Sequence, residues 1–257
     1  MGTIRHRAAA VLRFIDTVTQ TLVSGSSLQI QIRQKSPMIR KHDGCVVILA
    51  QSGVDSLDIA ASGACFLPVA LHISLAGEAP VAVQYIYLLP SPGYPFTPQM
   101  AVIFGTNAAC GLYAVRTADC GRYRLMEDFD ADKDVIRLWG VKKFLPGQQL
   151  LLNEEDQYAL VTLLEPDDET EQAYRIGEQV KACFQKGKTK VYSVIKISPD
   201  RNGSFCVAYD RIRKGGERIR FLEENICSQR KDAKAGITID TEAGIQEGQK
   251  IEINVGR

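Results

Sequence analysis

The sequence predicts an all-β fold, and three observations support this prediction. Short segments of alternating apolar and polar residues recur along the chain, β-branched and aromatic residues are frequent in them, and Gly, Pro, Ser or Asp separates one from the next. LQIQI at 28–32 shows the alternation most clearly, because its apolar side chains would share one face of a strand and its glutamines the other. Helical spacings of apolar residues are scarce. Many short strands between turn signals indicate β-sandwich domains.

Further segments have the composition of strands. They are CVVILA (45–50), PVALHIS (68–74), VAVQYIYLL (81–89), MAVIFG (100–105), VYSVIKI (191–197) and KIEINV (250–255). In the last segment we expect Ile251, Ile253 and Val255 to face the core, near the edge of a sheet. EDQYALVTLLE at 155–165 is compatible with either a helix or a strand.

The composition is that of an ordinary globular protein and limits the class of partner. The chain has 257 residues, of which 45% are hydrophobic and 24% charged, and this length suffices for two or three domains. With 31 basic and 30 acidic side chains the formal net charge is +1, so no global field attracts nucleic acid or an anionic membrane. No apolar run approaches the roughly 20 residues of a membrane span. We expect a cytoplasmic protein whose partners are other protein subunits.

The cysteines and histidines do not predict a metal or other cofactor. Seven cysteines are scattered without a CxxC pair, and of three histidines only His42 lies near a cysteine, Cys45. A zinc site needs four convergent ligands, usually with short paired spacings. His42 and Cys45 could act as base and nucleophile, but the sequence identifies no third group to orient them. We therefore expect reduced thiols and no enzymatic activity.

Three segments share one turn pattern, in which an Asp precedes a Gly and a strand follows. They are KHDGCVVILA (41–50), TADCGRYRLM (117–126) and SPDRNGSFCVAY (198–209). Asp caps its own turn and Gly accepts a positive φ, which is the chemistry of a tight hairpin. We therefore expect Gly44, Gly121 and Gly203 at equivalent hairpin positions of three similar sandwiches.

The segments VLRFIDTVTQTLVSGSSLQIQI, RKHDGCVVILA and SLDIAASGACFLPVALHIS follow one another within about residues 8–76. Together they resemble the carboxypeptidase-regulatory-like module, a seven-stranded sandwich of the transthyretin type. The positions that match the motifs of that family are Asp16, Val23 with Ser24, Asp43 with Gly44, and Ala61 and Gly63 with Phe66. Cys45 and Val46 stand where the family usually places an aromatic residue. The resemblance implies a scaffold that carries no catalytic residues.

The resemblance and the turn pattern together imply two to three tandem Ig-like or transthyretin-like β-sandwich domains. The expected domains are 1–90, 99–170 and 171–257, with 91–98 as a proline-rich linker. Four prolines in LLPSPGYPFTP fix φ and remove N–H donors, so a semi-rigid spacer is expected. Tyr94 of this spacer, with Phe96, could pin it against a neighbouring domain or form a surface for a partner.

Acidic and basic segments supply the remaining candidate sites. EDFDADKD places Asp128, Asp130 and Asp132 at alternate positions, which is typical of an oxygen-rich calcium loop. An EF-hand loop would need Gly and Glu where the sequence has Lys133 and Trp139. A calcium site of another kind and a solvated loop are the two readings that remain.

KGKTK (186–190) and RIRKGGERIR (211–220) are basic and contain glycine, but neither matches the phosphate-binding GxxxxGK[ST] pattern. In a hairpin, the four arginines of the second segment could form a basic tip for an acidic partner protein, or could serve solubility alone. They are Arg211, Arg213, Arg218 and Arg220.

The expected function is that of a non-catalytic structural or adaptor protein that docks within a larger protein assembly. The module together with YLLPSPGYPF (87–96) also resembles bacterial proteins associated with phage-tail-like contractile injection systems. That resemblance implies such a particle as the assembly, with release as part of it. The alternative is a carbohydrate-binding or adhesive β-sandwich module. Trp139 is the single tryptophan, whereas sugar-binding platforms usually display several aromatic residues.

Overall fold

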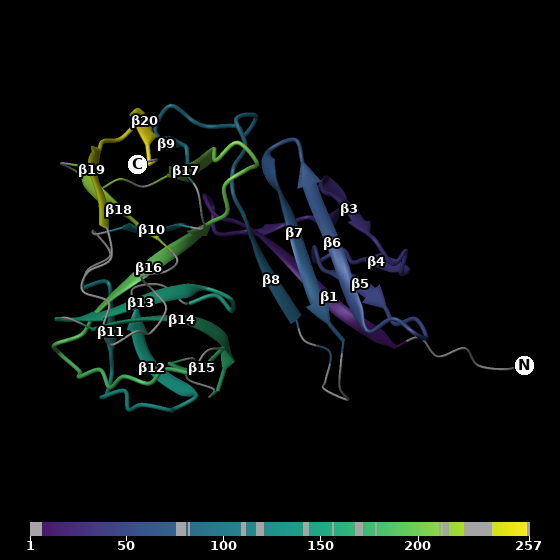
Figure 1. Ribbon diagram of the computed structural model, residues 1–257, viewed down its shortest axis with the longest axis horizontal. Helices are drawn as coiled ribbons and strands as arrows, with labels where there is room; N and C mark the ends of the chain where they lie inside the picture. The colour runs from purple at the N-terminus through teal and green to yellow at the C-terminus, as the bar shows by residue number, and fades with distance from the viewer. Residues whose placement is uncertain are drawn as a thin grey trace, which may run out of the picture. The chain divides into compact units, whose positions relative to one another are not determined.

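The computed structural model describes the chain except for a set of short segments. The residues outside the description are 1–6, 76–80, 82, 109–111, 117–120, 141–143, 156, 168–171, 178, 211, 213–215, 224–237 and 256–257. The described residues form twenty β-strands and one 3₁₀ turn at Gly25–Ser27, without an α-helix, which confirms the all-β prediction (Figure 1). No membrane-spanning helix occurs among them. The chain divides into two compact units: Met1–Phe96 with Cys206–Ala208, and Thr97–Phe205 with Tyr209–Arg257.

The first unit contains two sheets. The strands of the larger sheet are β1 (Ala8–Asp16), β2 (Leu22–Val23), β4 (Met38–Arg40), β5 (Val46–Leu49) and β8 (Val83–Leu88). The strands of the smaller sheet are β3 (Gln29–Ile32), β6 (Ser56–Gly63) and β7 (Phe66–Ser74). β1 is the central strand, because it pairs antiparallel with β2 and β5 and parallel with β8.

A single hydrophobic cluster joins both sheets of the first unit. Leu12 and Phe14 of β1 and Ile48 of β5 contribute from the larger sheet, and Ile30 of β3 and Leu57 of β6 from the smaller one. These residues alternate with more exposed ones along their strands, so the period-two pattern of the sequence places one face of each sheet in the core. The first unit is therefore a β-sandwich.

The proline-rich segment after β8 is fastened to the first unit, which extends to Phe96. The Tyr94 hydroxyl donates a 2.6 Å hydrogen bond to Oδ2 of the buried Asp16. Asp16 Oδ1 accepts from the backbone N–H of Val18 at 2.8 Å, so one carboxylate holds both the end of β1 and this segment. The Tyr94 ring also lies 5.8 Å from Phe66 and 5.1 Å from Phe96. Tyr94 is only 8% exposed, which favours the first of the two alternatives, a side chain that pins this segment, while Phe96 is half-buried.

Six strands of the second unit form a closed ring. They are β11 (Tyr123–Leu125), β12 (Val135–Gly140), β13 (Gln149–Glu154), β14 (Gln157–Pro166), β15 (Ala173–Ile176) and β16 (Lys190–Ile197). The order is β11-β12-β15-β14-β13-β16, and β16 pairs back with β11, all antiparallel. We call this ring the barrel. The segment 155–165, left open between helix and strand, lies mostly in β14.

The interior of the barrel is filled by apolar side chains from every strand. Ile136 of β12, Leu150 of β13, Val161 of β14 and Val191 of β16 are fully buried in one cluster with Tyr174 of β15. A small barrel of this kind has a packed core and no channel. Since β14 pairs with β15 and β13 pairs with β16, the boundary expected between residues 170 and 171 falls inside this continuous sheet.

The remaining strands of the second unit flank the barrel in sequence. They are β9 (Ala101–Thr106), β10 (Leu112–Arg116), β18 (Glu217–Glu223), β19 (Thr238–Ile245) and β20 (Lys250–Asn254), together with the two end residues of β17 (Phe205–Tyr209), whose middle residues Cys206–Ala208 are grouped with the first unit. β10 pairs with β16 and β18, and β18 with β19, while β9 lies between β17 and β20. The rings of Phe205 and Phe221, 5.7 Å apart, connect these two sheets. β20 ends its sheet with Ile251 and Ile253 half-buried and Val255 buried, as predicted.

The two units share part of their strand pattern. β9 pairs in parallel with β20, as β1 does with β8, and in both pairs the last residues are opposite each other: Asp16↔Leu88 and Thr106↔Asn254. β17 borders β9 as β5 borders β1, and the order β10-β18-β19 parallels β3-β6-β7. The strands β11–β15, which lie between β10 and β16 along the chain, have no counterpart among the described strands of the first unit.

The turns at Gly44 and Gly203 have the same local structure. Lys41 N–H donates to Cys45 O at 2.8 Å and Gly44 N–H to Lys41 O at 3.1 Å. The second turn has the same bonds, from Asp200 to Ser204 at 2.9 Å and from Gly203 to Asp200 at 3.0 Å. Gly44 joins the paired strands β4 and β5, whereas Gly203 joins β16 and β17, which belong to different sheets. Gly121, with φ +83°, precedes β11 of the barrel.

Replacing Gly203 with alanine should destabilise the second unit. φ is +74° there, and an added Cβ would lie 2.9 Å from Ala108 O. Gly53 has a similar φ of +75° but open space around it, so Gly53→Ala reports the backbone strain alone. We expect Gly53→Ala to cost about 1 kcal/mol of unfolding free energy and Gly203→Ala about 1–3 kcal/mol more, measured by urea denaturation. Equal costs would contradict the close approach.

Removal of the Tyr94 hydroxyl should weaken the first unit, because it leaves a buried carboxylate oxygen of Asp16 without its donor. We expect Tyr94→Phe to lower the unfolding free energy by about 1.5–3 kcal/mol. Tyr158→Phe, at a side chain that is 36% exposed, is the matched control and should change stability little. Chemical denaturation followed by circular dichroism measures both. A Tyr94→Phe protein as stable as the control would show that the hydroxyl does not hold the segment.

Candidate functional site

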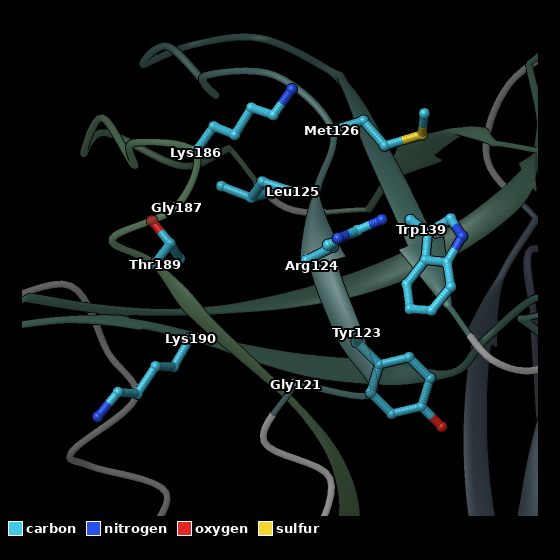
Figure 2. A pocket seen from close by; sticks show the side chains of 10 residues that line it. All are labelled: Gly121, Tyr123, Arg124, Leu125, Met126, Trp139, Lys186, Gly187, Thr189 and Lys190. Carbon is cyan, nitrogen blue, oxygen red and sulfur yellow. The ribbon is translucent and has the colours of Figure 1, made fainter.

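The candidate site is a pocket of about 470 Å³ in the barrel. It lies where β11 and β16 meet, which we call the seam. β11 and β16 pair only at Tyr123↔Val191. Beyond that pair, Arg124 to Met126 form one wall of the pocket and residues between Lys186 and Lys190 form the other (Figure 2). The two segments that the sequence analysis treated separately, GRYRLM and KGKTK, therefore line a single pocket.

Arg124 and Trp139 form the aromatic side of the pocket. They are opposite each other on β11 and β12, and the Arg124 guanidinium lies 4.5 Å from the centroid of the indole ring (Figure 2). Stacking on the ring restrains the guanidinium while its N–H edge can still bind an anion. The same contact occupies an indole face on which a sugar ring would otherwise stack.

The opposite wall is a turn whose backbone is held at several points. Glu154 at the end of β13 is buried, and its Oε2 accepts from Gln185 N–H at 2.7 Å and from the Thr189 hydroxyl at 2.6 Å. On the other side, Asp128 Oδ1 accepts from Lys186 N–H at 2.8 Å. The backbone that carries the two pocket lysines, Lys186 and Lys190, is thus fixed before any ligand arrives.

The pocket is locally basic in a nearly neutral chain. Glu127 and Asp130, the neighbouring acids, form ion pairs with Arg137 at 3.5 Å and Lys133 at 2.6 Å, and the second pair raises the pKa of Lys133. In contrast, none of the three pocket cations forms an ion pair with a carboxylate in the described part of the chain. These cations are Arg124, Lys186 and Lys190. Their charge is therefore available to an external anion.

The predicted calcium ligands do not converge. Asp128 accepts from the backbone of Lys186, Asp130 pairs with Lys133, and Asp132 Oδ1 accepts from Gln179 Nε2 at 3.0 Å. Among the described residues, no group of three or more His, Cys, Asp or Glu side chains is arranged to hold a metal ion. Asp128 and Asp132 instead bond to two different segments, and Asp130 pairs within its own loop.

Cys45 is paired with groups other than His42. Its thiol donates to Asp43 Oδ2 at 3.3 Å, and its sulfur accepts from Arg13 Nε at 3.0 Å. Burial, and then the hydrogen bond to Asp43, raise the pKa of the thiol. A raised pKa lowers the thiolate fraction, which is opposite to the activation that a nucleophilic cysteine needs. His42 is exposed on the adjoining turn.

The basic hairpin tip is described only in part. Arg218 and Arg220 lie exposed on β18, while Arg211 and Arg213 lie outside the described residues. Sequence reasoning missed the pocket because neither of its two segments contains a signal that identifies the other as a neighbour. The shared feature was their basic and glycine-containing composition.

Comparison of the chain with protein-family models, curated proteins and solved structures gave no match.

Substitution of Asp43 should make Cys45 more reactive. Asp43 contributes to the raised pKa of the thiol, so Asp43→Asn should lower that pKa and raise the thiolate fraction at a given pH. The alkylation rate of Cys45, followed against pH by mass spectrometry, should then rise at lower pH than in the parent protein. The exposed Cys183 is an internal control whose profile should not move. An unchanged or upward-shifted profile for Cys45 would contradict the assigned contact.

Proposed function

We propose that this protein works by docking, without catalytic turnover, as a subunit or adaptor of a larger protein assembly. The composition of the barrel pocket carries this proposal. The ten lining residues that belong to the described part of the chain include three cations, Trp139 and Tyr123, and among these ten there is no carboxylate, histidine or cysteine. General acid–base and nucleophilic catalysis usually depend on those missing side chains. Arg, Trp and Tyr are instead the residues that contribute most to binding at protein interfaces.

We also propose that the chain consists of two tandem transthyretin-like sandwiches, with the barrel inserted into the second. The shared pairing of β1 with β8 and of β9 with β20 supports this division, as do the similar turns at Gly44 and Gly203. Such an arrangement offers several sheet ends for docking. β4, β7 and β20 are edge strands of their sheets. On β4, the Ile39 side chain is 44% exposed. Backbone groups at a sheet edge can accept a strand from another chain.

Purification of the tagged full-length chain from its native host tests the proposal. We expect defined partner proteins in fixed stoichiometry, and the resemblance noted for YLLPSPGYPF makes a contractile tail-like particle the first assembly to examine. Deletion of residues 248–257 removes β20 from its five-residue pairing with β9 and should reduce partner recovery or unfold the second unit. His42→Ala and Cys45→Ala should retain the partners.

Two results would contradict docking without turnover. The first is a measured catalytic activity that either His42→Ala or Cys45→Ala abolishes. The second is an assembly that forms with unchanged composition when this protein is deleted from the host.

A further inference from the structure

We infer that the barrel pocket binds a short, extended acidic segment of the partner protein. This inference rests on the proposed docking function and names the chemistry of the partner at one site. It depends on the open seam, on the charge of the two walls and on the anchoring of their backbone.

The pocket lies where β11 and β16 no longer pair, so it opens along the free side of one strand. β11 runs antiparallel to β16 and meets it at Tyr123↔Val191 alone, so Arg124 to Met126 have β12 on one side and the pocket on the other. A strand-like peptide can lie along such an opening and use alternate side chains for specificity. An extended occupant therefore fits the seam better than a compact one.

The charges of the walls select an acidic occupant. Arg124 lies on one wall and Lys186 on the other, while the Lys190 ammonium points away from Trp139 (Figure 2). A guanidinium held on an indole ring can bind a carboxylate through two parallel N–H donors. Met126 and Trp139 are half-buried and offer apolar surface to the aliphatic part of a glutamate side chain.

The anchored backbone lowers the cost of binding. Phe129 and Phe184 exchange backbone hydrogen bonds of 2.9 and 2.8 Å, which ties the loop after β11 to the segment before the lysine turn. The bonds from Glu154 and Asp128 hold the turn itself. Because the walls are already ordered, a ligand need not pay for their ordering, and few contacts suffice for measurable affinity.

The surrounding acids favour a peptide over a nucleic acid. Glu127, Asp128 and Asp130 follow directly on the Arg124 wall, and the chain as a whole has a formal net charge of +1. A long polyanion depends on many Lys and Arg contacts along its backbone, and here it would meet these acids. A short acidic segment needs only a few cations, and Arg124 and Lys186 supply one on each wall.

Trp139 makes the test specific to the site, because it is the only tryptophan and lines the pocket. The purified full-length chain is titrated at low ionic strength with a blocked hexaglutamate peptide while tryptophan emission is recorded. We expect a saturable change in emission that a blocked hexaglutamine peptide does not produce. Arg124→Gln and Lys186→Gln should each weaken binding about tenfold. Circular dichroism checks that each variant is folded. If Arg124→Gln does not fold, the affinity of Lys186→Gln still tests the inference, because Lys186 is exposed.

Lys188→Gln is the matched control, since Lys188 is exposed in the same turn but does not line the pocket. It should keep the affinity of the parent protein. Equal binding of the two peptides, an equal loss in Lys188→Gln, or tighter binding of a single-stranded oligonucleotide would each overturn the inference. If partner proteins are recovered but hexaglutamate does not change the tryptophan emission, the acidic-segment inference is refuted and the docking function is not. A response to hexaglutamate without any recovered assembly would refute only the docking role.

Discussion

The second unit depends on the single backbone pair that closes the barrel, Tyr123↔Val191. Without it, β11 would be the edge of an open sheet beside the apolar core cluster, because β10 pairs with β16 only from Val194 to Ile197. With it, every barrel strand has two neighbours and the core cluster is enclosed. Because the closure involves one pair only, the strands separate immediately beyond it. The same contact thus completes the fold and leaves the pocket.

Buried carboxylates fasten the loops at the places where strands no longer pair. Glu154 at the end of β13 holds the turn of Lys186, and Asp16 at the end of β1 holds the segment of Tyr94. In both cases one acid at a strand end accepts a hydrogen bond from chain that is distant in sequence: Glu154 from Gln185 and Thr189, and Asp16 from Tyr94. Such bonds to a charged acceptor are stronger than those between neutral groups. Loop positions near both sheets are therefore set by the strand ends.

The strands could be predicted from sequence where the signal was local. Alternation identified LQIQI and KIEINV, and the half-buried positions of Ile251 and Ile253 between exposed neighbours followed from it. The barrel could not be predicted, because β11 has only three residues and its closure joins positions 68 residues apart along the chain, 123 and 191. For Tyr94 the sequence left two alternatives open, and only the position of Asp16 decided between them. The pocket was missed for the same reason as the barrel.

A net charge of +1 excludes a strong long-range field but not a basic site. In this barrel the acids and cations differ in whether they form ion pairs, according to where they lie. Arg137 and Lys133 neutralise Glu127 and Asp130, and the cations on the two sides of the seam have no such partners among the described residues. At physiological ionic strength the field of a few charges extends only about 8 Å. A site of this kind recognises an anion after contact and does not attract it from a distance, which suits a partner already held nearby by other surfaces.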